Sequence, residues 1–211
     1  MKMAKIMVVG ASGTIGRAVA DLFKKNHEVI YVGKHQGDYL VDLTLKGTIE
    51  DLCETTGSVD AVVCIAGQSR FAKVSEASDD DFAFSIEHKL MGQVNLVRVA
   101  LSTVNRNGSI TLTTGVLAQK PWPGTVPTAM VNAALEGFVR AAALDVENGI
   151  RINAVSPIFV TETALRMGMA ESGTMSAAQT AKAYQACVEG SMTGQVLDVR
   201  DYGKIHGEEG P

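Results

Sequence analysis

Residues 128–132 place one hydroxyl and one amide on the same face of an expected helix. Their sequence, TAMVN, opens the mostly apolar run TAMVNAALEGFVRAAALDV. Residues four apart in a helix point the same way, so Thr128 and Asn132 should share a ligand or a neighbour. Both side chains form hydrogen bonds, but neither titrates near neutral pH. A structural alternative makes Thr128, which follows Pro127, a cap-like residue and Asn132 a buried amide satisfied by its neighbours.

A second candidate site is the glycine-rich segment GASGTIG at residues 10–16. It directly follows a buried strand predicted at 4–9 and opens a helix with an apolar stripe. Glycines there let the backbone approach a pyrophosphate, and the helix N-terminus favours its charge. The alternative is that the glycines serve only tight packing of helix against strand. We expect the cofactor contacts of this segment to come from Gly10, Ser12, Gly13, Thr14, Ile15 and Gly16.

The end of the strand predicted at 28–33 indicates which dinucleotide is bound. NAD sites usually carry an acidic residue there to hold the ribose hydroxyls. This chain has Gly33, Lys34, His35 and Gln36 instead. A lysine can pair with a 2′-phosphate, and no carboxylate repels it. The sequence therefore predicts NADP(H) bound by Lys34 and His35, with two solvated loop residues as the alternative.

Strands and helices alternate along the chain. The expected strands are 4–9, 28–33, 39–42, 59–67, 108–114, 150–157 and 195–199, and the expected helices follow the glycine turn and span 46–56, 79–104 and 128–147. This alternation predicts parallel strands with crossover helices on both faces. We expect one domain over residues 1–211: an α/β, three-layer, doubly wound parallel sheet of the NAD(P)-binding Rossmann type. Such sheets bind ligands beyond the carboxyl ends of their strands.

Composition narrows the classes of partner. The chain has 211 residues, 46% hydrophobic, with a net charge of −4. That charge gives no long-range attraction for nucleic acid or anionic membrane, so a small-molecule substrate is expected. Apolar runs are too short to span a bilayer and no signal peptide is recognisable, which favours the cytoplasm. The three cysteines form no CxxC pair and are expected to be packed, reduced thiols. The four histidines lack metal-ligand spacing, so no metal site is expected.

Three segments outside the expected core have distinct compositions. Residues 119–127 hold three of the five prolines and Trp122, and should form a rigid connection where a substrate would bind. Residues 164–178, with Met167, Met169 and Met175, are expected to form a mobile apolar flap. The polar tail 201–211 is expected to be loosely held.

Several motifs in order resemble those of the short-chain dehydrogenase/reductase family. They are GASGTIG, VDLT at 41–44, CIAG at 64–67, the strand ITLTT, and NAALEGFVRAAALDVENGIRINAVSP, which together span nearly the whole chain. The resemblance implies that Asp42 and Leu43 flank an adenine and that Ala66 and Gly67 approach a cofactor ribose. By the same resemblance, the remaining cofactor-binding positions are Thr113, Pro157, Thr161 and Thr163. It also implies a homodimer or homotetramer built largely from the helices at 79–104 and 128–147.

The chain departs from this family at its catalytic positions. Family members carry a catalytic Asn, Ser, Tyr and Lys, the last two four apart on one helix. Here the Tyr and Lys positions hold Thr128 and Asn132. The serine position falls on Thr114, or on Gly115 if the register slips by one. The asparagine position is Lys89.

These departures leave two functions open. In the usual mechanism a tyrosine donates a proton while a lysine lowers its pKa, and a threonine is too weak an acid to replace it. Lys89, next to His88, is the candidate replacement, unless both are only surface charges. The first hypothesis is an NADPH-dependent oxidoreductase whose proton comes from water or Lys89 and whose substrate is a small carbonyl or activated alkene. The second is a catalytically inactive NADP(H)-binding sensor or scaffold. The family resemblance favours the enzyme.

Overall fold

The protein is built on one seven-stranded sheet, seen in a computed structural model that describes residues 3–201. The strand order is β3-β2-β1-β4-β5-β6-β7, and every neighbouring pair is parallel. The strands are β1 (Lys5–Val9), β2 (Glu28–Gly33), β3 (Tyr39–Leu40), β4 (Val59–Cys64), β5 (Val104–Thr113), β6 (Arg151–Ser156) and β7 (Val196–Asp198). The predicted doubly wound α/β fold of the Rossmann type is confirmed.

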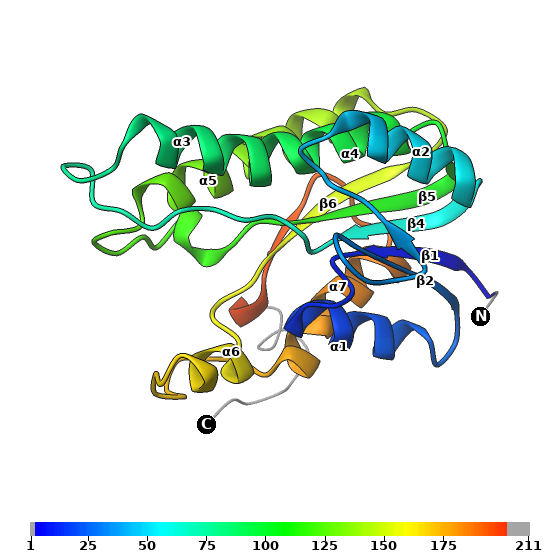
Figure 1. Cartoon of the computed structure of the whole chain (residues 1–211). Helices are drawn as coiled ribbons and strands as arrows, with labels where there is room; N and C mark the ends of the chain where they lie inside the picture. The colour runs from blue at the N-terminus through cyan, green and yellow to red at the C-terminus, as the bar shows by residue number, and fades with distance from the viewer. Residues whose placement is uncertain (1–2, 202–211) are drawn as a thin grey trace.

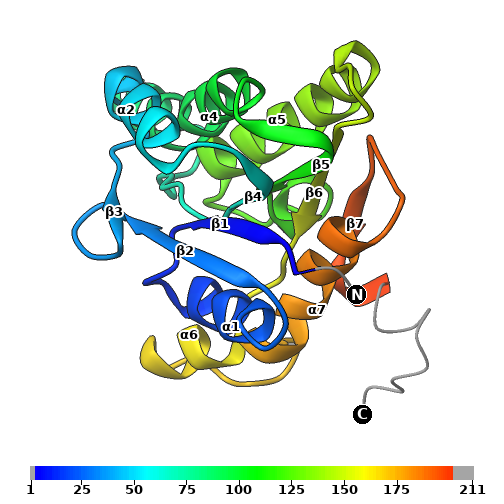
Figure 2. The ribbon, with the colours of Figure 1, turned by 90° about the vertical axis from the view of Figure 1, so that its right-hand side faces the viewer.

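Helices cover both faces of the sheet (Figure 1). They are α1 (Thr14–Phe23), α2 (Lys46–Thr56), α3 (Asp79–Ser85), α4 (Gly92–Ala100), α5 (Val126–Asp145), α6 (Thr161–Arg166) and α7 (Ala177–Glu189), with a π-turn η1 (Ile86–Met91) and a 3-10 turn η2 (Val116–Ala118). Figure 2 shows α2, α4 and α5 on one face, and α1, α6 and α7 on the other. None of these helices is long and apolar enough to cross a bilayer.

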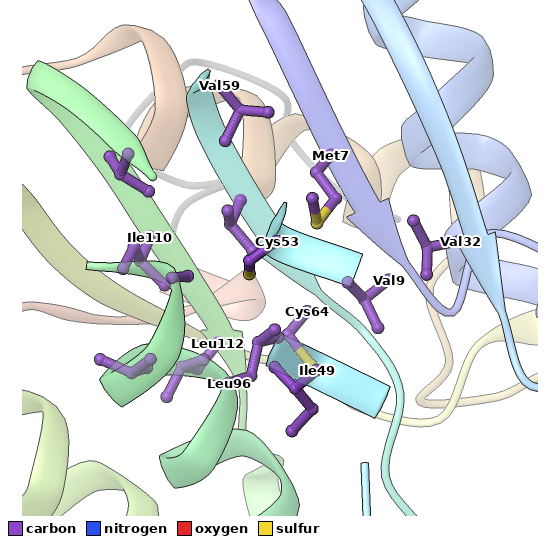
Figure 3. Close-up of a cluster of buried hydrophobic side chains, with 14 of the residues drawn as sticks. Met7, Val9, Val32, Ile49, Cys53, Val59, Cys64, Leu96, Ile110 and Leu112 are labelled. Carbon is purple, nitrogen blue, oxygen red and sulfur yellow. The ribbon is translucent and has the colours of Figure 1, made fainter. Parts of the chain in front are cut away.

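Two hydrophobic clusters hold the three layers together. In β1, Met7 and Val9 face α2, α4 and α5, while Ile6 and Val8 face α1 and α7. Figure 3 shows the first cluster, in which Ile49 of α2 and Leu96 of α4 lie among side chains of the central strands. Because both faces are buried, the central strands are continuous apolar runs rather than alternating ones. Because the strands are parallel, the polar groups at their carboxyl ends all lie at one edge of the sheet.

The long helix expected at 79–104 is three consecutive elements. Ser78 begins α3 with a capping box shared with Asp81. The π-turn η1 then interrupts the α-helical register, and α4 ends at Ala100 because Val104 pairs with Val59 as the start of β5. A π-helical turn contains about one more residue than an α-helical turn, and such turns inside helices are common at functional sites. It contains His88 and Lys89.

Two helices lie in a part of the chain for which no helix was predicted. α6 covers 161–166 and α7 starts at Ala177, so each helix overlaps one end of the flap predicted at 164–178. Ser176 and Gln179 form a capping box at the start of α7, a signal that was present in the sequence. The flap is tied at its base by a bridge between Val160 and Met175. Most of the predicted loose tail, residues 202–211, lies outside the described residues.

Gln93 fixes the end of β5 against α4. Its side chain is fully buried, and its Nε2 donates to the Thr113 carbonyl at 2.9 Å. Its Oε1 accepts from the Thr113 N–H at 3.0 Å. One side chain thus satisfies both backbone groups of the residue that precedes Thr114, so it sets the position of the strand end.

We expect Gln93→Leu to lower the free energy of unfolding by at least about 2 kcal/mol. Two buried backbone groups would lose their partners, at about 1–3 kcal/mol each. Denaturant unfolding measures the change. Gln185→Leu, on the outer part of α7, is the matched control and should change stability by less than about 0.5 kcal/mol. Equal effects of the two substitutions would contradict this role for Gln93.

Candidate functional site

A cleft of about 420 Å³ runs along the carboxyl edge of the sheet. It gathers the glycine turn, the end of β2, the loop after β3, the end of β4, the π-turn and the start of α6. Of the predicted cofactor-binding residues, those that line it are Gly10, Ser12, Gly13, Thr14, Ile15, Lys34, Asp42, Leu43, Ala66, Gly67 and Thr163. Sequence segments that lie more than a hundred residues apart therefore meet in one elongated groove.

The other predicted cofactor residues lie outside the lining of the cleft. Gly16 is buried behind the turn, and His35 is exposed on the loop after β2. The Thr113 hydroxyl donates to the Cys64 carbonyl at 2.7 Å. The Thr161 hydroxyl pairs with Thr174 at 2.9 Å, and the Pro157 carbonyl accepts from the Val116 N–H. The last three therefore have hydrogen-bonding roles within the fold.

The three glycines of the turn have different roles. Gly10 has φ +91°, and a Cβ there would lie 2.8 Å from the Ala66 nitrogen. A Cβ on Gly16 would lie 2.0 Å from the Gly10 oxygen, so both residues are glycine for packing. A Cβ on Gly13 would meet the same oxygen at 3.4 Å, an ordinary contact. Gly13 begins α1 without a side-chain cap, so the first N–H groups of the helix face the cleft unshielded.

Arg166 of α6 is a cation at this turn that the sequence did not indicate. Its Nη2 donates to the Thr14 hydroxyl at 2.6 Å and to the Thr163 hydroxyl at 3.2 Å. In both views α6 lies beside α1 (Figures 1 and 2). Arg166 and Thr14 are 152 residues apart, and no local pattern links them. A second hollow, of about 680 Å³, opens between α1 and the α6–α7 segment on the far side of the turn.

Lys34 forms an ion pair across the outer end of the cleft. Its Nζ lies 2.8 Å from Asp42 Oδ2, and the Thr44 hydroxyl donates to Asp42 Oδ1 at 2.8 Å. The hydrogen bond from Lys34, supported by Thr44, lowers the pKa of Asp42 to about 2. A Cβ on Gly33 would lie 2.3 Å from the Gln36 oxygen. The backbone therefore excludes an acidic side chain at the last position of β2.

The π-turn brings His88 and Lys89 to the cleft. The Lys89 ammonium donates to the Thr114 carbonyl at 2.9 Å, and burial lowers its pKa to about 8. Its Cγ lies 3.0 Å from the Cβ position of Gly67, which lines the cleft. His88 also lines the cleft, with its ring 3.9 Å from that of Phe84. Neither residue is a freely solvated surface charge.

Thr128 and Asn132 differ in how their polar atoms are used. The buried Thr128 hydroxyl donates to the Arg70 carbonyl at 2.8 Å and lies 2.8 Å from the Ser69 hydroxyl. It anchors the loop after β4. Asn132 is 2% exposed, and its Oδ1 has no hydrogen-bond partner among residues 3–201. The Thr114 hydroxyl donates to the Val155 carbonyl at 3.4 Å.

Two contacts join the proline-rich loop at 119–127 to neighbouring loops. Trp122 of the proline-rich loop lies with its ring 5.8 Å from that of Phe159, which follows β6. The Val126 N–H donates to the Ala72 carbonyl, which joins this loop to the loop after β4. Trp122 remains 44% exposed, and Met167 and Met169 of the flap are also exposed. These two segments therefore leave large apolar side chains exposed near the carboxyl edge.

Residues 4–192 match the protein family described as enoyl-(acyl carrier protein) reductase. Over 173 residues the chain is 27% identical to the oxidoreductase UcpA of Escherichia coli strain K12. That match covers 80% of this chain and 63% of UcpA, so the chain spans less than two thirds of that relative.

Solved structures share the fold over nearly the whole chain. The protein lin1944 of Listeria innocua matches with a TM-score of 0.89 and 38% identity, over 94% of this chain and 100% of that one. A small-chain dehydrogenase in complex with NADPH matches with a TM-score of 0.83 and 25% identity. This second match covers 93% of this chain and 96% of that one.

The two inner glycines of the turn should respond differently to the same substitution. We expect Gly16→Ala to lower the free energy of unfolding by about 1–3 kcal/mol, because the new methyl meets the Gly10 carbonyl. Gly13→Ala should cost less than about 1 kcal/mol, the usual effect of alanine at a helix N-cap. Thermal unfolding of the two variants measures this. A Gly13→Ala protein as unstable as Gly16→Ala would make Gly13 a packing glycine.

Replacing Lys34 should raise the pKa of Asp42. We expect Lys34→Met to raise the pKa of Asp42 from about 2 toward its ordinary value of 3.8, and Thr44→Val to raise it less. Carbon-detected NMR titration of the carboxyl group measures both. Because the folded pKa is the lower one, the ion pair stabilises the protein fully above pH 4, and its contribution is lost as pH falls toward 2. An unchanged Asp42 titration in Lys34→Met would contradict the pairing.

Proposed function

The chain belongs to the short-chain dehydrogenase/reductase family of oxidoreductases, and from this membership we propose that it is an NADP(H)-dependent oxidoreductase with an altered active site. The carboxyl-edge cleft is the observation that carries the proposal, because it is lined by the glycine turn and by Lys34. A bound NADPH would supply a hydride. The substrate is a small carbonyl compound or activated alkene that enters between the Trp122 loop and the flap.

The residues present fit a dinucleotide with a 2′-phosphate. The N-terminus of α1 and Gly13 would hold the pyrophosphate. Lys34 is the charged partner for the 2′-phosphate, and its ion pair with Asp42 already holds it at the cleft. The backbone around Gly33 excludes the acidic side chain that an NAD site would place there. A similar small-chain dehydrogenase with bound NADPH supports the same cofactor.

The altered active site follows from the partners of Thr128. Its hydroxyl is committed to the Arg70 carbonyl, and an aliphatic alcohol is too weak an acid to protonate a substrate near neutral pH. Any proton delivered in this site would therefore come from another group. Thr114, whose hydroxyl faces the Val155 carbonyl, would contribute its main-chain carbonyl rather than its side chain.

We also propose that the protein is a homodimer or homotetramer. The π-turn and α5 carry partly exposed apolar side chains, among them Ile86, Met91 and Met130. α5 also exposes Leu144, which is 86% accessible. Association through these helices would cover this apolar surface and leave the cleft open.

A catalytically silent NADP(H) sensor is the second candidate. The observation that favours it is the same commitment of Thr128 to a structural hydrogen bond. Such a protein would bind NADPH tightly yet oxidise it no faster than the solvent background with any carbonyl substrate. A calorimetric titration with NADPH, followed by a turnover assay on a panel of aldehydes, ketones and diketones, separates the two functions. Absence of NADPH binding would contradict both.

Two cations should have separable effects on cofactor affinity. We expect Lys34→Ala to weaken NADPH at least about tenfold while leaving NADH nearly unchanged, since a charge-assisted phosphate contact is worth about 1.5–3 kcal/mol. Arg166→Ala should weaken NADPH and NADH equally, because both carry a pyrophosphate. Calorimetry on both variants measures this. Lys46→Ala, which removes a surface cation of α2, is the control. Equal wild-type affinities for NADPH and NADH would contradict the NADP(H) assignment.

A further inference from the structure

Lys89 and Asn132 converge on the two residues that follow β5, and Lys89 also packs against Gly67, which lines the cleft. The Lys89 ammonium donates to the Thr114 carbonyl at 2.9 Å. Asn132 packs on the next residue, where its Nδ2 would lie 2.9 Å from a Cβ on Gly115. Gly115 has φ +157° and follows the last residue of β5 by two positions. The two side chains therefore reach the Thr114–Gly115 peptide from different helices, Lys89 from the π-turn and Asn132 from α5.

Asn132 Oδ1 is a buried acceptor for which residues 3–201 supply no hydrogen-bond donor. Its side chain is 2% exposed, and Oδ1 is unpartnered among the described residues. Leaving a buried acceptor unsatisfied is unfavourable, so such atoms in native proteins usually await a ligand or a water molecule. The group that bonds to Asn132 Oδ1 must donate a hydrogen, as a hydroxyl group does.

Lys89 offers the complementary chemistry. An ammonium has three hydrogens, and the Thr114 carbonyl accepts only one of them. Burial holds the pKa of Lys89 at about 8, so the ammonium and the amine are both populated near neutral pH. The titratable groups around it are Cys64 on β4, whose pKa burial raises to about 12, and His88 and Glu87 on its own turn. No carboxylate among the described residues is recorded within 4.0 Å of its ammonium.

We propose that Lys89 and Asn132 bind the reacting oxygen of a carbonyl substrate, and that Lys89 is the proton donor of this site. The inference rests on the proposed NADP(H)-dependent function. As a hydride adds to the carbonyl carbon, the C=O π pair takes a proton from the Lys89 ammonium and an O–H bond forms. Lys89 is left as the neutral amine and regains a proton from water. Asn132 Oδ1 then accepts a hydrogen bond from the product hydroxyl, so the pair fits a carbonyl before the reaction and an alcohol after it.

Calorimetry first separates this role from binding of the cofactor. Lys89→Met and Asn132→Leu should bind NADP⁺ and 2′,5′-ADP with wild-type affinity, since the pair contacts the substrate. If either variant weakens NADP⁺ but not 2′,5′-ADP, the pair holds the nicotinamide ribose and the proposal is wrong. Wild-type protein that binds neither ligand would instead overturn the proposed function. Lys46→Met and Asn95→Leu are the matched controls on α2 and α4.

Reduction of 4-nitrobenzaldehyde by NADPH then tests whether Lys89 donates the proton. Lys89→Met should lose about 10²- to 10⁴-fold in kcat, the usual contribution of a general acid. Wild-type kcat/KM should be constant below pH 8 and fall above it as the ammonium is lost, and this limb should be absent in Lys89→Met. Asn132→Leu should keep the limb but lose turnover. Full activity of Lys89→Met, or the same fall in its kcat/KM above pH 8, would overturn the proposal.

Chemical labelling tests the same proposal even when the wild-type protein reduces this aldehyde slowly. With cyanoborohydride at pH 7.5, an aldehyde bound at the pair condenses with the Lys89 amine, loses water and is reduced to a secondary amine. Mass spectrometry should find Lys89 modified before Lys46 and other surface lysines, because more of it is unprotonated. Asn132→Leu should slow this labelling at least about threefold. Labelling of surface lysines with Lys89 untouched would contradict the proposal.

Discussion

The parallel sheet, covered by helices on both faces, is the constraint on which the rest of the structure depends. Six consecutive parallel pairings require a crossover after each strand, and both faces must then be apolar. Polar chemistry is confined to the loops at the carboxyl edge. The glycine turn, Lys34, the loop after β4 and the start of α6 therefore meet in one cleft, although none of them is next to another in the sequence.

Three unrelated segments place a cation in the lining of this cleft or against residues that line it. Lys34 comes from the end of β2, Arg166 from α6 and Lys89 from the π-turn, and each is held by a hydrogen bond or ion pair. Fixing long, flexible side chains before a ligand arrives reduces the conformational entropy lost on binding. The distribution suits an elongated anionic cofactor with a reacting group at one end.

Neighbouring polar residues at the site differ in whether the fold satisfies their hydrogen bonds. Thr113 and Thr128 use their hydroxyls on backbone carbonyls, at Cys64 and Arg70. Asn132 lies one helical turn beyond Thr128 on α5, yet its Oδ1 remains unpartnered among the described residues. Similar side chains on the same helix thus have different roles, and only their surroundings distinguish them. The π-turn has a similar effect, because it brings Lys89 to the strand end from a helix whose periodicity looks regular.

The sequence by itself determined the alternation of strands and helices, the parallel sheet, the glycine turn and most of the residues along the cleft. These features depend on local periodicity and on motifs whose spacing is fixed by one turn of chain. The capping box of α7 was a signal that the prediction missed, and nothing in the sequence indicated the π-turn or the position of Arg166. The sequence also left open whether Thr128, Asn132 and Lys89 were structural or functional. The partner of Thr128 is 58 residues away and that of Arg166 is 152. Such contacts are decided by how the layers pack, which tertiary structure alone shows, because the partners share no pattern in the sequence.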